Sequence, residues 1–212
     1  MQAFTKQGNI RMAYEYDVFI SYRRESDSKE WTEDIFFPKF KSYLREELGK
    51  KALNIFIDEQ GIEGGQYWED TLKIALAKSK CLVPVLMPSY FQSEWCVREF
   101  SVLYHRQEQL VPKPKSLIVP FVIWDGDHFP PPAKALHYFP CHEYYHTGQG
   151  FKDSVRYFEF QEKLKKWVVA VAKAIRSAPA WDNNWLDDTW LDLPLDNFLL
   201  DDDLSIAQPR NI

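Results

Sequence analysis

The stretch YDVFIS, at residues 16–21, is a short run of mostly apolar residues that is rich in β-branched and aromatic side chains. Continuous runs of this kind are typical of strands that are buried on both faces of a parallel sheet. Three later runs have the same character, at residues 53–58, 81–87 and 117–124. Pro84 and Pro120 fit the pattern least, because proline cannot donate a hydrogen bond to a neighbouring strand. The four runs together predict four strands.

Four other stretches carry apolar residues at helical spacing, at residues 34–48, 68–78, 94–107 and 158–175. Gly49 is expected to cap the first of them, and Pro38 to start or kink it. The alternation of strand and helix predicts right-handed crossovers, and therefore a parallel sheet with helices on both faces. We expect one more short strand near residues 136–139, inside a long irregular region.

Charge is distributed unevenly and divides the chain into three parts. Residues 177–212 hold eight Asp and one Arg, with no Glu or Lys, a balance of −7; the whole chain is −5, so residues 1–176 sum to +2. We expect a polar arm at residues 1–13, a domain at residues 14–176 and an acidic tail. The tail interleaves Trp and Leu with aspartates, which favours docking onto its own domain or, through residues 178–203, onto a partner protein.

The composition also excludes several classes of function. No block of Lys and Arg marks a nucleic-acid partner, and no apolar run is long enough for a membrane span. The N-terminus lacks the pattern of a secretory signal, and three widely spaced cysteines argue against a disulfide framework, so we expect a cytoplasmic protein. His137, Cys141, His142 and His146 lie close in sequence, but no CxxC or HExxH accompanies them, and we expect no metal site.

Ligands of parallel sheets bind beyond the carboxyl ends of the strands, and three segments should meet there: residues 22–24, 58–68 and 88–99. Arg23 and Arg24 should point in opposite directions in extended backbone, so that one binds a phosphate while the other braces a loop. The alternative is a pair of solvated arginines, and position alone does not separate the two interpretations. Pattern alone favours a plain surface turn for the glycine-rich segment at residues 58–68.

Trp95 and Glu99 are four residues apart and should share one face of a helix. An aromatic plane beside a carboxylate can hold a flat ring and a sugar, and the carboxylate can stabilise an oxocarbenium-like transition state. The alternative is a core tryptophan and a solvated glutamate, which the spacing alone favours.

Four motifs, in order, resemble those of the Toll/interleukin-1 receptor (TIR) domain family over roughly residues 14–176. They are YDVFISYRR (16–24), FIDEQGIEGGQYW (56–68), LKIALAKSKCLVPVLMPSYFQSEWCVREF (72–100) and LIVPFVIW (117–124). The resemblance implies a flavodoxin-like α/β fold, with a central parallel sheet of about five strands and helices on both faces.

The double arginine and the W-x-x-x-E motif resemble the enzymatic, NAD-cleaving members of the family, of bacterial type. The resemblance implies an NAD+ glycohydrolase or cyclase that splits the nicotinamide–ribosyl bond, giving nicotinamide and ADP-ribose or a cyclic isomer. NAD+ would be the substrate, and no cofactor is expected. Glu99 is then the catalytic residue, and this overturns the preference for a solvated glutamate. The expected substrate-binding residues are Phe19, Tyr22, Arg23, Arg24, Asp58, Trp68 and Trp95.

The resemblance also implies homo-oligomers formed through TIR–TIR contacts, and a role in prokaryotic antiviral defence signalling. Two alternatives stay open. One is a non-catalytic TIR adaptor that acts by assembly alone, and the other is a sensor that binds NAD-derived ligands without cleaving them.

Overall fold

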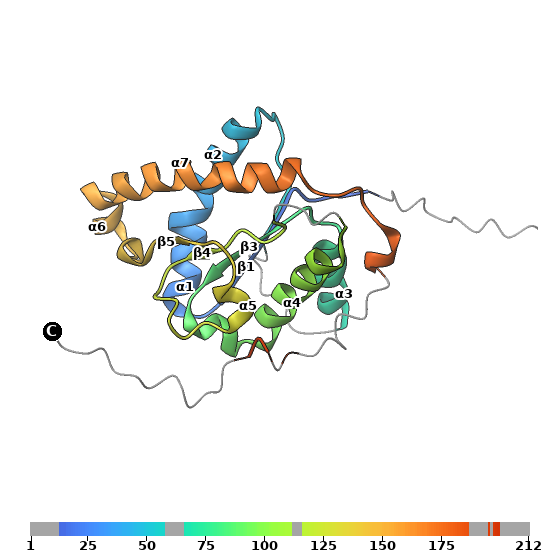
Figure 1. Cartoon of the computed structure of the whole chain (residues 1–212). Helices are drawn as coiled ribbons and strands as arrows, with labels where there is room; N and C mark the ends of the chain where they lie inside the picture. The colour runs from blue at the N-terminus through green and yellow to red at the C-terminus, as the bar shows by residue number, and fades with distance from the viewer. Residues whose placement is uncertain (1–12, 58–65, 112–115, 187–194, 196, 200–212) are drawn as a thin grey trace, which may run out of the picture.

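A computed structural model describes residues 13–57, 66–111, 116–186, 195 and 197–199, and it has five parallel strands in one sheet (Figure 1). The strands lie in the order β2-β1-β3-β4-β5, which is the flavodoxin-like order. The predicted α/β fold is therefore confirmed. The strands are β1 (Val18–Tyr22), β2 (Ile55–Ile57), β3 (Leu82–Leu86), β4 (Phe121–Val122) and β5 (Phe139–Pro140).

The longer helices cover the two faces of the sheet, and short helices and turns connect them. The long ones are α2 (Phe37–Leu48), α3 (Gln66–Ala77), α4 (Glu94–Gln109) and α7 (Val155–Arg176). The short ones are α1 (Ser26–Glu30), α5 (Pro131–Lys134), α6 (Gln149–Lys152) and the 3-10 turns η2 (Pro88–Gln92), η3 (His142–Tyr144) and η4 (Asn183–Leu186).

The first helical region starts earlier than residue 34, where the sequence predicted it. α1 continues through a π-helical turn, η1 (Trp31–Phe36), directly into α2. Pro38 lies in the first turn of α2, directly after the π turn, and so near the start of the α-helical segment as predicted, although the helical region as a whole begins at α1. Gly49 ends α2 with φ 61°, as predicted for a C-cap.

Pro84 and Pro120 shorten the ladder between β3 and β4. Leu82 bridges Ile118 and Val85 pairs with Phe121, and the same register puts the two prolines opposite each other. Because neither nitrogen can donate, the ladder is interrupted at this point. The run predicted as a strand at residues 117–124 is therefore reduced to the two residues of β4 and one isolated bridge.

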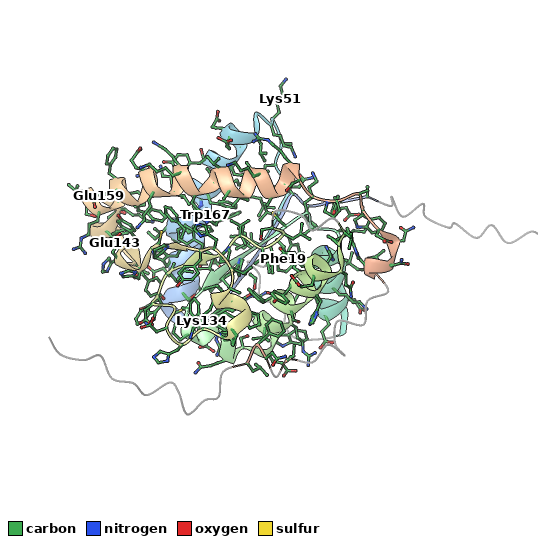
Figure 2. All side chains as sticks on the ribbon, viewed as in Figure 1. Phe19, Lys51, Lys134, Glu143, Glu159 and Trp167 are labelled. Carbon is green, nitrogen blue, oxygen red and sulfur yellow. The ribbon has the colours of Figure 1, made fainter. Side chains whose placement is uncertain are left out.

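The sheet has a hydrophobic core on each face. α2 and α7 pack over one face, around Trp31, Phe121 and Trp167. α3 and α4 cover the other, which holds Phe19 and Phe100. In Figure 2, Phe19 and Trp167 lie inside the molecule, whereas Lys51 extends outward. Lys134, Glu143 and Glu159 are also exposed.

The described part of the acidic tail lies on its own domain. The ring of Trp185, in η4, stacks under the Arg106 guanidinium of α4 at 4.3 Å. Further on, Phe198 is 3% exposed and packs against α4 residues Phe100, Tyr104 and His105. The tail thus contacts α4 at two points. Among the helices that the structure describes, none combines the length and apolar character needed to cross a membrane.

Candidate active site

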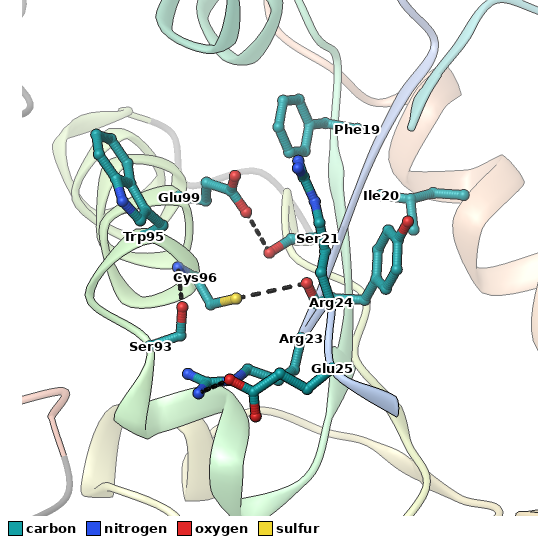
Figure 3. A pocket seen from close by; sticks show the side chains of 11 residues that line it. Phe19, Ile20, Ser21, Arg23, Arg24, Glu25, Ser93, Trp95, Cys96 and Glu99 are labelled. Atoms are coloured by element: carbon teal, nitrogen blue, oxygen red, sulfur yellow. Dashed lines mark hydrogen bonds and ion pairs between the residues drawn. The ribbon is translucent and has the colours of Figure 1, made fainter. Parts of the chain in front are cut away.

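A pocket opens at the carboxyl end of β1, facing the first turns of α4 (Figure 3). Its cavity volume is about 290 Å³, at the lower end of the volumes of small-molecule sites. The position follows the rule that ligands of parallel sheets bind beyond the strand ends. The lining residues are Phe19, Ile20, Ser21, Tyr22, Arg23, Arg24, Glu25, Ser93, Trp95, Cys96 and Glu99.

Ser93 fixes the start of α4 and so the direction of the two residues that the sequence paired. Its side chain accepts a hydrogen bond from the Cys96 backbone nitrogen at 3.4 Å, as an N-cap does. Trp95 and Glu99 then lie one turn apart and both line the pocket. Trp95 is half-buried and Glu99 is only 7% exposed. This geometry contradicts the alternative of a core tryptophan beside a solvated glutamate.

The carboxylate of Glu99 is held by a hydroxyl group from the sheet. Ser21 Oγ donates to Glu99 Oε2 at 2.5 Å, and the hydroxyl of Tyr90 lies 2.7 Å from Ser21 Oγ. Burial raises the pKa of Glu99 to about 7, although the Ser21 hydrogen bond and the Arg24 charge both act to lower it. Near neutral pH, Glu99 is therefore present in both protonation states.

The two arginines leave the end of β1 in different directions (Figure 3). Arg23 pairs with Glu25, two residues further along the chain, and so braces the loop. Arg24 lies close enough to Glu99 for its charge to lower the pKa of that carboxyl group. Arg23 therefore has the bracing part that was predicted for one arginine, while phosphate binding by the other stays a prediction.

Phe19 and Tyr22 both border the pocket, but their rings lie on opposite faces of the sheet. Phe19 stacks on Phe56 with ring centroids 4.9 Å apart, on the α4 face. Tyr22 packs into the other core, and its hydroxyl donates to Glu33 Oε1 at 2.5 Å. The Tyr22 ring therefore faces away from Trp95 and Glu99, whereas Phe19 lies on their side of the sheet.

The side chains of two predicted site residues, Asp58 and Trp68, cannot be placed at the pocket. Asp58 lies outside the described residues. Trp68 belongs to α3, but the structure does not describe its side chain. Within the described ranges, no group of three or more His, Cys, Asp and Glu side chains is arranged to hold a metal ion. Cys81, Cys96 and Cys141 are buried and have free thiols.

Residues 18–155 match the family described as the TIR domain. This chain belongs to the TIR domain family. The probable 2′ cyclic ADP-D-ribose synthase BdTIR of Brachypodium distachyon is 26% identical over 137 residues, covering 62% of this TIR chain and 57% of that protein. The NAD(+) hydrolase TcpA of Theionarchaea archaeon (strain DG-70-1) is 29% identical over 121 residues, covering 57% of this chain and 32% of TcpA.

The TIR chain thus spans between about a third and three-fifths of the length of these curated relatives. Among solved structures, the TIR domain of the Toll-related receptor TRR-2 from Hydra magnipapillata aligns with 70% of this chain and 98% of its own. Its sequence identity is 16% and its TM-score is 0.42.

Sequence reasoning missed five residues that line this TIR domain's site, Ile20, Ser21, Glu25, Ser93 and Cys96, and also Tyr90, which contacts Ser21. Ser93 had a signal, because a serine directly before a predicted helix is a common N-cap. Ser21 also had one, since alternation along β1 puts it on the same face as Phe19. Tyr90 had none, because its contact depends on how η2 packs against the sheet.

Proposed function

We propose that this TIR domain is an NAD+ glycohydrolase or cyclase that breaks the nicotinamide–ribosyl bond, with Glu99 as the catalytic residue. The observation that carries the proposal is a buried carboxylate beside an aromatic ring and an arginine, in a pocket at the ligand-binding edge of the sheet. Two similar proteins, named as the probable 2′ cyclic ADP-D-ribose synthase BdTIR and the NAD(+) hydrolase TcpA, support the same chemistry.

In the proposed reaction, the nicotinamide ring lies against Trp95 and the attached ribose reaches Glu99. The bond from the ribose C1′ to the ring nitrogen breaks, and its electron pair neutralises the cationic ring. Positive charge develops on the ribose, and the Glu99 carboxylate stabilises it. Water then attacks C1′ and loses a proton to give ADP-ribose; attack by a nucleophile of the same molecule gives a cyclic isomer.

The diphosphate is proposed to lie near the two arginines at the end of β1. Arg24 offers charge on the Glu99 side of the pocket, and Arg23 holds the loop through Glu25. Both line the pocket, so that a phosphate there meets guanidinium groups whose planar donors suit its oxygens.

A cavity of about 290 Å³ has room for the nicotinamide riboside half of NAD+, and the adenosine half would bind to a further surface. We propose that a second copy supplies it, so that homo-oligomers formed through TIR–TIR contacts complete the site.

We further propose that the protein acts in the cytoplasm, in prokaryotic antiviral defence. Three buried free thiols are compatible with a reducing compartment.

The test is to incubate the purified chain with NAD+ at several protein concentrations and to measure free nicotinamide and bound nucleotide. An enzyme completed by assembly releases nicotinamide at a rate that rises more steeply than protein concentration. Binding without release would instead indicate a sensor of NAD-derived ligands. Neither binding nor release, in a protein that self-associates, would indicate the non-catalytic adaptor.

A further inference from the structure

The Glu99 carboxylate is the end of a buried chain of hydrogen bonds that joins three elements. Ser21 belongs to β1, Tyr90 to η2 and Glu99 to α4. The Ser21 hydroxyl lies 2.5 Å from Glu99 Oε2 and 2.7 Å from the Tyr90 hydroxyl. Ser21 and Tyr90 are both almost fully buried. Because all three groups are shielded from water, each hydrogen bond costs free energy if it is lost.

We propose that Ser21 and Tyr90 are positioning residues, whose two hydroxyl groups hold one orientation of the Glu99 carboxylate and favour its ionised form. The Ser21 bond takes Oε2, which leaves Oε1 as the oxygen that a substrate hydroxyl can meet (Figure 3). This inference rests on the proposed function only in naming Glu99 as the residue that meets substrate. The hydrogen-bond chain can be tested without any substrate.

Proton counting gives the chain a direction. A serine hydroxyl has one proton, so when Ser21 donates to an ionised Glu99, Tyr90 must donate to Ser21 Oγ. Tyr90 keeps its proton because burial raises its pKa well above its ordinary value. When Glu99 is protonated, the chain can reverse, with Glu99 donating to Ser21 and Ser21 to Tyr90. The orientation of the carboxyl group is thus retained in both protonation states.

The other groups that face Glu99 do not replace this chain. Arg24, beyond the end of β1, adds a positive charge that lowers the pKa of Glu99. The thiol of Cys96, on α4, stays neutral because burial raises its pKa to about 12. Among the described neighbours, Ser21 therefore contributes the hydrogen bond to the ionised form, and Arg24 contributes the charge.

Three substitutions separate positioning from simple packing. Ser21→Ala removes the donor to Glu99, and Tyr90→Phe removes the second link but leaves the first. Ser21→Thr keeps the hydroxyl group and should therefore keep the hydrogen bond to Glu99. The matched control is Ser101→Ala, a fully buried serine on α4 whose hydroxyl donates to the Arg98 backbone oxygen at 2.9 Å instead.

The first measurement is the midpoint of Glu99 titration, read from urea unfolding between pH 5 and pH 9. Each variant is compared with the same variant carrying Glu99→Gln, so that the difference reports Glu99 alone. We expect Ser21→Ala to move the midpoint upward by about one pH unit or more, because a hydrogen bond to a charged group is lost. Tyr90→Phe should move it upward by less, and Ser21→Thr and Ser101→Ala should leave it in place.

The proposal is overturned if neither Ser21→Ala nor Tyr90→Phe moves that midpoint. A shift with Ser21→Ala and none with Tyr90→Phe would overturn the part assigned to Tyr90. Should Ser21→Ala fail to fold, Tyr90→Phe alone decides the question.

The second measurement is the pH profile of NAD+ cleavage. In Ser21→Ala, the profile of kcat/KM should move by the same amount, and kcat at pH 7 should fall by about tenfold with KM little changed. A fall in kcat/KM that comes only from a higher KM, with kcat unchanged, would contradict a positioning role. If the parent protein releases no nicotinamide, the proposed function fails, while the unfolding measurement still decides the hydrogen-bond chain.

Discussion

The ring of Phe198, in the acidic tail, packs against the ring of Phe100, the residue that directly follows Glu99, with centroids 5.9 Å apart. The same ring touches Tyr104 and His105, so the tail covers the outer side of the helix that carries the candidate catalytic residue. Phe198 is thus an apolar anchor that holds the described part of the tail on its own domain.

Phe198→Ala should destabilise the domain by roughly 2–4 kcal/mol, since it empties a buried aromatic site. Urea unfolding measures this directly. Leu199→Ala is the matched control, because Leu199 is 39% exposed and its loss should cost less than about 1 kcal/mol. Equal effects of the two substitutions would show that the tail is not anchored in this way.

Glu99→Gln should make the protein more stable at pH 8. The pKa of Glu99 in the folded state, about 7, lies above its ordinary value of 4.5. The folded state therefore retains a proton that the unfolded state has lost, and stability falls as pH rises through this window and levels off above pH 7. The difference corresponds to about 3 kcal/mol, and the neutral amide avoids this loss.

The measurement is the unfolding free energy of the parent and Glu99→Gln proteins at pH 4 and pH 8. The gap between them should be small at pH 4 and open at pH 8. A gap of the same size at both values would argue against a buried carboxyl group that titrates near neutrality.

The rate of NAD+ cleavage should rise with pH and level off above pH 7. The ionised carboxylate stabilises the cationic transition state, and the fraction of ionised Glu99 in the free protein grows through its pKa of about 7. A profile of kcat/KM from pH 5 to pH 9 tests this. A rate that falls over that range would indicate that the protonated form is the active one.

Arg24→Gln and Arg23→Gln should act differently although the residues are neighbours. Loss of the Arg24 charge should move the acid limb of the kcat/KM profile upward by roughly 0.5–1 pH unit, because that charge lowers the pKa of Glu99. Arg23 pairs with Glu25, so its loss should weaken substrate affinity without moving the limb. Identical shifts in the two variants would contradict the assigned division.

Much of the fold was predictable because long runs with one clear period dominate it. β1, β3, α4 and α7 lie within a few residues of their predicted bounds. The early start of the first helix was not predictable, because the stretch before residue 34 is almost entirely polar. Its one large apolar residue, Trp31, lies in the core and donates from Nε1 to the Tyr144 backbone oxygen at 2.9 Å.

The site divides in the same way. Trp95 and Glu99 could be paired from spacing, and the parallel sheet predicted that they would meet the arginines. Which arginine faces Glu99 could not be predicted, since it depends on where Glu25 holds Arg23. Alternation along β1 puts Ser21 on the same face as Phe19, but its contact with Tyr90 and Glu99 could not be predicted, because that contact requires β1, η2 and α4 to pack together.

The most direct test of the central claim compares nicotinamide release from NAD+ by the parent protein, Glu99→Gln and Glu108→Gln at pH 8. Glu108 is exposed and lies on the same helix, so that substitution controls for the chemistry of the change. We predict that Glu99→Gln, folded and at least as stable as the parent, is slower by roughly a hundredfold or more, while Glu108→Gln retains the parent rate. Equal rates for the parent and Glu99→Gln would contradict the assignment of Glu99 as the catalytic carboxylate.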